Sequence, residues 1–271
     1  MKKHFKGNEI GEFDYDTKDY EVIVTSGGET LHYIGNGKKV QLPRGCTDCN
    51  NMFRDYKGKL LDLSEFDTTG VTDMSCMFAS ATNLVSLDLS KFDTSMVEDM
   101  KCMFINCTSL KSLNLLAFDT SKVRDMHKMF SGCIELEYVN LCSFKHNNLT
   151  DISYMFQYCK DLKELDLSFL KGTVFRDLYG MFYMCSSLRV LDLSQIKVED
   201  KFSIFQAVDG CKGLETLGLP ILDCSEVVTQ KGELSSLESL KYLETKYKIY
   251  VDDYDKWGMA EMKVNRTLSV M

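Results

Sequence analysis

Two cysteines near the start of the chain have the spacing of a metal-binding pair. Cys46 and Cys49 enclose two residues, and paired thiolates at that spacing can hold zinc. The sequence contains no second such pair, and Cys76 and Cys102 could complete a four-thiolate site only if the first repeats folded back onto them. A capping turn explains Cys46 and Cys49 without a metal. We therefore predict no cofactor and no metal.

An aspartate recurs at one position of a 26-residue period and could be mistaken for a calcium ligand. The column consists of Asp73, Asp99, Asp125, Asp151 and Asp177. Calcium needs six or more oxygen ligands that converge on one point. An aspartate at the start of a helical segment instead accepts hydrogen bonds from the unpaired amides of the first turn. We predict this capping role for the column.

Catalytic chemistry has few candidates in this sequence. The four histidines, His4, His32, His127 and His146, lie in no recognisable nucleophile elbow or triad motif. The segment 35–38, Gly-Asn-Gly-Lys, lacks the first glycine of a phosphate-binding loop, since His32 stands there, and no Ser or Thr follows the lysine. A hairpin turn is the better interpretation. We expect no catalytic residues and no enzymatic activity.

All of these residues are positioned by an internal repeat of 26 residues. A fixed period of this length is typical of stacked-repeat proteins. The leucine columns are Leu63, Leu89, Leu115, Leu141, Leu167, Leu193 and Leu219, and Leu84, Leu110, Leu136, Leu162, Leu188 and Leu214. The Met-Phe column is Met77-Phe78, Met103-Phe104, Met129-Phe130, Met155-Phe156 and Met181-Phe182. The cysteine column, Cys107, Cys133, Cys159, Cys185 and Cys211, would be buried, so we expect high thiol pKa values and low reactivity.

Each repeat can be read as one coil of a solenoid. Leu87-Asp88-Leu89 alternates apolar and polar residues, which indicates a short strand with the leucines inward. A polar turn follows at 93–95, and apolar residues then recur every three or four positions from Val97 to Leu110, as on a helical face. Since one coil cannot bury its leucines alone, coils must stack. The sequence predicts an α/β leucine-rich-repeat solenoid with a parallel sheet on its concave face.

Atypical segments at both ends should cap this solenoid. We predict an N-terminal β cap over 1–45, the solenoid over 46–220 and a C-terminal cap over 221–271. In the first cap, hairpins are expected from the strand-like segments 20–24, 31–34 and 40–42. A degenerate first repeat carries Met52-Phe53. In the last cap, leucine spacing predicts a helix over 233–247, followed by a strand over 247–251.

The repeat resembles a known family. The sequence from Leu87 to Met100, Leu-Asp-Leu-Ser-x-Phe-Asp-Thr-Ser-x-Val-x-Asp-Met, is similar to the BspA-like leucine-rich repeats of bacterial surface lipoproteins, and the similarity extends from about Leu61 to Leu219. The resemblance implies a curved parallel-sheet solenoid, a role in adhesion or protein binding, and no catalytic residues. Members of that family are typically exported or anchored.

Composition narrows the location and the partner. The net charge of -8 argues against a nucleic-acid-binding surface, so a charged partner should be a basic protein. Residues 1–13 show no signal-peptide pattern, and no segment is apolar enough to span a membrane. Eleven cysteines without an export signal favour a reducing compartment. We expect a cytoplasmic protein with a protein partner and no direct contact with nucleic acid or membrane.

Outward-facing strand positions that vary between repeats are the predicted binding surface. There the middle repeats carry apolar residues and amides, with acidic residues around them, a composition that fits a protein interface. The candidates are Asp88, Asn114, Leu116, Tyr138, Asn140, Cys142, Glu164 and Asp166. The alternative is that these positions drift without a functional constraint.

A change of charge along the turn row that follows the strands adds two further candidates, Asp93 and Asp119. Asp67, Asp93 and Asp119 occupy this row in the early repeats, and Lys145, Lys171 and Lys197 occupy it later. Such a polarity could orient a partner and speed its docking, although turn residues also vary freely.

Two functions remain compatible with the sequence. The first is a module that binds a basic protein through the concave face, and an intracellular copy of such a module suggests an effector or a phage or mobile-element inhibitor of a host protein. The second is a structural or adhesive repeat protein that self-assembles or acts at the cell surface.

Overall fold

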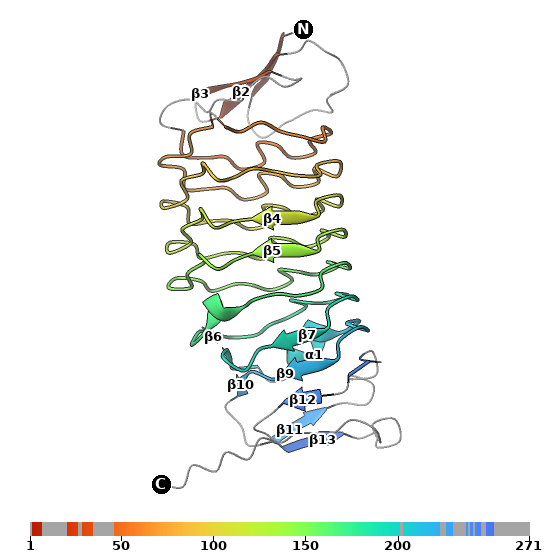
Figure 1. Ribbon diagram of the computed structural model, residues 1–271. Helices are drawn as coiled ribbons and strands as arrows, with labels where there is room; N and C mark the ends of the chain where they lie inside the picture. The colour runs from red at the N-terminus through yellow and green to blue at the C-terminus, as the bar shows by residue number, and fades with distance from the viewer. Residues whose placement is uncertain are drawn as a thin grey trace.

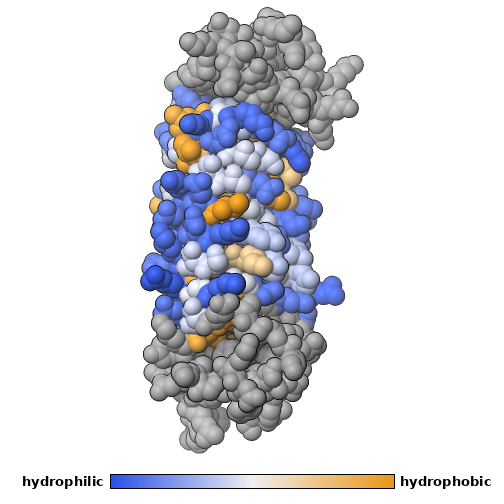
Figure 2. Space-filling view, turned by 90° about the vertical axis from the view of Figure 1, so that its right-hand side faces the viewer, coloured by the Kyte–Doolittle hydropathy of each residue, from blue (hydrophilic) through white to orange (hydrophobic). Residues whose placement is uncertain are grey.

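The protein is a stack of flattened coils, one coil per repeat (Figure 1). The computed structural model describes the backbone of residues 2–6, 21–26, 29–34, 46–64, 66–200, 203–222, 226–229, 237, 239–240, 242–244 and 248–251. Figures 1 and 2 show a stack without pronounced curvature, whereas the sequence predicts a parallel sheet on a concave face. Figure 2 also shows that one side of the stack is mainly hydrophilic, with small separate apolar spots.

Short parallel strands line one long side of the stack, here called the strand face. β4 (Ser112–Asn114) pairs with β5 (Tyr138–Asn140), and β7 (Val190–Asp192), β9 (Thr216–Gly218) and β12 (Tyr242–Glu244) form one sheet in the order β12-β9-β7. Residues pair one repeat apart, as Leu113 does with Val139. A second parallel sheet contains β6 (Val174–Phe175), β8 (Lys197–Val198) and β10 (Ile221–Leu222), and η1 (Ser168–Leu170) precedes β6.

The other long side of each coil, here called the turn face, is built from β-turns instead of the predicted helix. In residues 74–81, Met77 N bonds to Met74 O at 3.3 Å, Ala79 N to Cys76 O at 3.0 Å and Ala81 N to Phe78 O at 3.1 Å, which makes three overlapping turns. Cys76 and Ser80 have φ of 56° and 59°, the positive φ that a type II turn requires at its third position.

The turns leave half of the amides free to join neighbouring coils. Cys76 N donates to Lys101 O at 2.8 Å, and Phe78 N donates to Met103 O at 2.9 Å. The same arrangement recurs over 100–107, 126–133, 152–159 and 178–185. In a helix these amides would bond to carbonyls of the same coil. The turns leave them available for a ladder of backbone hydrogen bonds between coils. In the next coil this side becomes α1 (Ser203–Val208), the one α-helix of the described residues.

Stacked phenylalanines form the centre of the core. Ring centroids are 5.4 Å apart for Phe78 and Phe104, 5.6 Å for Phe104 and Phe130, and 5.3 Å for Phe130 and Phe156. A second ladder runs from Phe66 through Phe92 and Phe118 to Phe144. The predicted leucine, methionine, phenylalanine and cysteine columns are buried, which confirms their inward assignment.

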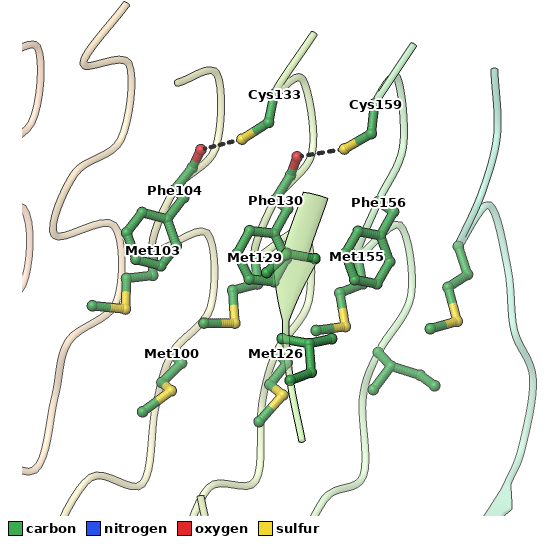
Figure 3. Packing of buried hydrophobic residues seen from close by; sticks show 14 of the residues in the cluster. Met100, Met103, Phe104, Met126, Met129, Phe130, Cys133, Met155, Phe156 and Cys159 are labelled. Atoms are coloured by element: carbon green, nitrogen blue, oxygen red, sulfur yellow. Dashed lines mark hydrogen bonds between the residues drawn. The ribbon is translucent and has the colours of Figure 1, made fainter. Parts of the chain in front are cut away.

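The cysteine column also bonds each coil to the one before it. Cys133 Sγ donates to Phe104 O at 3.1 Å, and Cys159 Sγ donates to Phe130 O at 3.1 Å, as Figure 3 shows. Cys107, Cys185 and Cys211 make the equivalent bonds at 3.0 to 3.1 Å. Each thiol is therefore buried as a small apolar group and also supplies a weak donor to a backbone carbonyl.

Buried threonines perform a similar role near the turn row. Thr94 Oγ1 donates to Asp119 O at 3.0 Å and accepts from Asp119 N at 2.8 Å. Thr68 and Thr120 bond in the same way to Asp93 and Lys145 of the following coils. Each hydroxyl satisfies both backbone groups of one residue in the next coil, so the polar side chain can be buried at little cost.

The ends of the chain agree with the predicted caps only in part. β2 (Glu21–Ser26) and β3 (Glu29–Ile34) pair antiparallel as the predicted hairpin, and β1 (Lys2–Lys6) adds a parallel strand. The predicted strand 40–42 lies outside the described residues. β13 (Lys248–Val251) confirms the last predicted strand and pairs with β11 (Glu226–Thr229).

The predicted C-terminal helix is wrong over 242–244. These residues form β12, which extends the parallel sheet from β9 because Leu243 takes the register position of Leu217 in the next coil. Most of the remaining span lies outside the described residues. Within the part of the chain that the structure describes, no helix has the length and apolar character needed to cross a bilayer.

Candidate protein-binding surfaces

The apolar candidates of the strand face are exposed and lie at two different ends of the strands. Leu116 and Tyr138 are each 54% exposed, and Cys142 is exposed too. Leu116 and Cys142 are neighbours in successive coils. Tyr138 starts β5, whereas Leu116 follows the end of β4, so the two lie at opposite ends of this strand pair. Glu164 is exposed one coil after Tyr138.

The polar candidates lie between these apolar residues, and their side chains accept hydrogen bonds within local turns. Oδ1 of Asp88, Asn114, Asn140 and Asp166 accepts the amide two residues further on, at 3.0, 3.2, 3.1 and 2.8 Å. In the case of Asp88, the hydrogen bonds from the backbone and the side chain of Ser90 lower the pKa of the carboxyl group. An asparagine oxygen accepts the same bond, so the change from Asp to Asn in the middle coils preserves the turn. The column therefore has a structural role that the sequence did not reveal.

The turn row carries the predicted change from acidic to basic residues. Asp93 and Asp119 each accept the amide two residues ahead, at 3.0 and 2.9 Å. Lys145 Nζ lies 3.0 Å from Asp119 Oδ2 in the preceding coil. The hydrogen bonds from Ser121, and then Lys145, lower the pKa of Asp119. The two halves of the row thus meet in an ion pair.

The aspartate column at the start of the turn face makes turns as well. Asp99 Oδ1 accepts Lys101 N at 2.8 Å, and Asp125 Oδ1 accepts His127 N at 2.7 Å. The predicted acceptance of an amide bond is correct, but the segment that follows is a series of turns instead of a helix. Burial raises the pKa of Asp99, and the charges of Asp73 and Asp125 in the adjacent coils raise it further.

The thiols of Cys46 and Cys49 in the first coil interact with each other. Cys49 is buried, and its hydrogen bond with Cys46 and its burial raise its pKa well above the usual range. Among the described residues, no group of three or more His, Cys, Asp and Glu side chains could hold a metal ion.

A serine, a histidine and an aspartate lie together on the turn face, as in a catalytic triad, but their hydrogen bonds connect them differently. His127 Nδ1 lies 2.7 Å from Ser153 Oγ, and Ser153 Oγ donates to Asp151 Oδ1 at 2.6 Å. In a triad the histidine receives the serine proton and the carboxylate holds the other ring nitrogen. Here Ser153 Oγ bonds to the carboxylate itself, and the same ring nitrogen of His127, Nδ1, lies 3.9 Å from Asp151 Oδ2. The order of bonds therefore differs from that of a catalytic triad.

Four tyrosines form two contacting pairs on the turn face of two successive coils. This tyrosine cluster consists of Tyr154, Tyr158, Tyr179 and Tyr183. Ring centroids are 5.2 Å apart for Tyr154 and Tyr179 and 5.4 Å apart for Tyr158 and Tyr183, in edge-on contact. Tyr158 and Tyr179 are 40% and 43% exposed. Gly180, with φ of 61°, makes room for Tyr154, since a Cβ there would lie 2.5 Å from that ring.

Charged groups surround the tyrosine cluster. Lys128 Nζ lies 5.1 Å from the centroid of the Tyr154 ring, within cation–π distance. Burial, and then Tyr179 and the Asp177 charge, raise the pKa of Tyr154. Sequence reasoning missed the cluster because it placed these residues on a helix and searched only the strand face. The available signal was four tyrosines in two adjacent repeats.

These features define the class of the protein as a repeat protein with a turn-built solenoid. The family model described as "Mycoplasma protein of unknown function, DUF285" matches residues 47–165 and 106–216, which together span more than half of the chain. The chain belongs to this family. The match agrees with the repeats predicted from the sequence. It does not extend to the narrower similarity to BspA-like proteins.

A solved internalin from Listeria monocytogenes is similar to this chain at 15% sequence identity and a TM-score of 0.33. The similarity covers 73% of this chain, which spans 66% of the internalin chain's length. No curated protein matches the sequence.

Proposed function

We propose that this protein is a non-enzymatic binding module that docks a protein with a basic surface on the tyrosine cluster. The observation that carries the proposal is two pairs of contacting tyrosines on one face of the stack, each with one exposed ring, Tyr158 at 40% and Tyr179 at 43%. Tyrosine is enriched in protein interfaces because it offers a large contact area with few rotatable bonds. The ladder beneath fixes the rings before binding, which lowers the entropic cost of association.

Charge supports a basic partner. The side chain of Asp151 is 46% exposed beside the tyrosine cluster, and the pKa of Tyr183 is raised by Tyr158, by burial and by the nearby Asp209. The chain as a whole has a net charge of -8. Arginine and lysine side chains of a partner could stack on the tyrosines, as Lys128 does on Tyr154, and pair with these aspartates.

The strand face is a second candidate surface. The exposure of Leu116 and Tyr138, 54% for each, favours it, as do the exposed carboxylates of Glu164 and Asp166. A partner that binds there would span the two ends of β4 and β5 and cross the row of turn-forming asparagines. An adhesive role of the BspA-like kind would also use such a face.

Paired variants distinguish the two surfaces. Tyr158→Ser with Tyr179→Ser alters the turn face, and Leu116→Ser with Tyr138→Ser alters the strand face by the same number of exposed residues. Proteins captured from the lysate of cells that make the protein would be quantified for each variant. We expect the basic proteins bound by wild type to be lost from the turn-face variant and kept by the strand-face variant. The reverse pattern would move the function to the strand face.

A further inference from the structure

Two cysteines occupy the same position in neighbouring coils of the turn face. Cys76 N donates to Lys101 O at 2.8 Å, and Cys102 N donates to His127 O at 2.9 Å, so both lie in one parallel ladder. Each has φ of 56°. Adjacent chains in such a ladder are about 4.8 Å apart, which is within the Cα separation that a disulfide spans.

The environment of this pair differs from that of the buried cysteine column. Cys76 and Cys102 are half-buried, and their thiols interact with each other. The hydrogen bond from Cys102 lowers the pKa of Cys76 to about 7, with the help of the charges of Arg54 and Lys101. Burial instead raises the pKa of Cys107 to about 12. The Cys76 thiol can therefore form a thiolate near neutral pH, unlike the thiols of the buried cysteine column.

We propose that Cys76 and Cys102 form a redox-active dithiol that a small disulfide, such as oxidised glutathione, converts into a disulfide between two coils. The Cys76 thiolate attacks one sulfur of the small disulfide, which forms a mixed disulfide and releases one small thiolate. Cys102 then loses its proton and attacks Cys76 Sγ, which releases the second thiolate. The two protein thiols are oxidised, and the small disulfide is reduced to two thiols.

The disulfide would join two coils that are otherwise held by hydrogen bonds and packing. It closes a loop of 26 residues, from one repeat to the same position in the next. The next coils carry Lys128 and Tyr154 in this column, so the modification is confined to one junction of the stack. The oxidised protein should melt at a higher temperature than the reduced protein.

Peptide mapping of the full wild-type chain tests the proposal. The reduced protein would be treated with oxidised glutathione, alkylated and digested with trypsin. Cys76 is the only cysteine in the fragment 60–91, whereas the fragment 102–111 holds Cys102 and Cys107, so fragmentation must assign the second partner. We expect a Cys76–Cys102 link, a loss of two titratable thiols and no retained glutathione on either residue. Dithiothreitol should restore both thiols.

Single variants supply the control. In Cys102→Ser, Cys76 should keep glutathione as a stable mixed disulfide, because the resolving thiol is gone. In Cys142→Ser, which removes an exposed cysteine of the strand face, the Cys76–Cys102 link should form as in wild type. The proposal is overturned if wild-type Cys76 keeps glutathione, stays reduced at oxidant concentrations that modify Cys142, or links to Cys107.

Discussion

At the scale of single residues, the recurring side chains of this protein serve the backbone. Aspartate and asparagine accept amides two residues ahead, threonines bond both backbone groups of a residue in the next coil, and cysteines donate to buried carbonyls. The leucine, phenylalanine and cysteine burial could be predicted from periodicity. The threonine and cysteine bonds could not, because residue types alone do not say which carbonyl a side chain faces.

Replacing Thr94 with Val should lower the free energy of unfolding by about 1–3 kcal/mol. The substitution keeps the shape of a buried side chain but leaves the amide and carbonyl of Asp119 without their partner. Urea denaturation measures the change. Thr94→Ser should lose less, because it keeps both bonds, and the exposed Thr69→Val should change stability by less than about 0.5 kcal/mol. Equal losses in Thr94→Val and Thr69→Val would contradict the role of the threonine bonds.

Asp99 should make stability depend on pH. Because burial and the charges of Asp73 and Asp125 raise its pKa in the folded state, the folded protein holds the proton more tightly than the unfolded chain. The group therefore lowers stability at neutral pH, and this penalty disappears as the pH falls through its folded-state pKa.

Asp99→Asn keeps the turn bond to Lys101 and removes the charge. We expect it to raise stability at pH 7 by less than about 1 kcal/mol, since the side chain is only half-buried and solvent screens the repulsion. Thermal melting from pH 7 to pH 3 should show this advantage shrinking as the pH falls. Asp99→Ala, which loses the bond, should be less stable than Asp99→Asn by about 1 kcal/mol. An advantage that grows toward low pH would refute the assignment.

At the scale of elements, the apolar spacing of each repeat predicts a helix where the structure has turns. Apolar residues every three or four positions suit a helix, but three overlapping turns bury Met100, Phe104 and Cys107 equally well. The neighbouring coil decides between them, because only the turns leave amides for the ladder between coils. Lys128 and Tyr154 have positive φ, a conformation that their residue types rarely adopt, so the sequence does not indicate these turns. The tyrosine cluster was missed for the same reason.

Adjacent leucines test the orientation of the strand element. Leu115 is fully buried and Leu116 is 54% exposed, although they are neighbours in sequence. Leu115→Ala should lower the free energy of unfolding by about 2–5 kcal/mol through loss of packing and a residual cavity. Leu116→Ala should change it by less than about 0.5 kcal/mol. Chemical denaturation of both variants measures the difference, and similar values would contradict the inward assignment of the leucine column.

At the scale of the whole molecule, each coil contacts mainly the coils before and after it. The 26-residue period was enough to predict a stacked solenoid, because one coil cannot bury its own leucines. Its slight curvature could not be predicted, since curvature depends on small rotations between coils that the shared columns do not encode. The same limit applies to the proposed function, because the proposed binding surface is defined by the few positions at which the coils differ.

The most direct test of the proposed function is site-specific photo-cross-linking in cells that make the protein. A photoreactive phenylalanine analogue would replace Tyr179 on the turn face in one variant and Tyr138 on the strand face in another. These side chains are 43% and 54% exposed, so both can accept the probe. We predict that the probe at 179 cross-links a protein with a basic surface and that the probe at 138 does not. Cross-linking of that protein only from 138 would contradict the assignment of the tyrosine cluster as the binding surface.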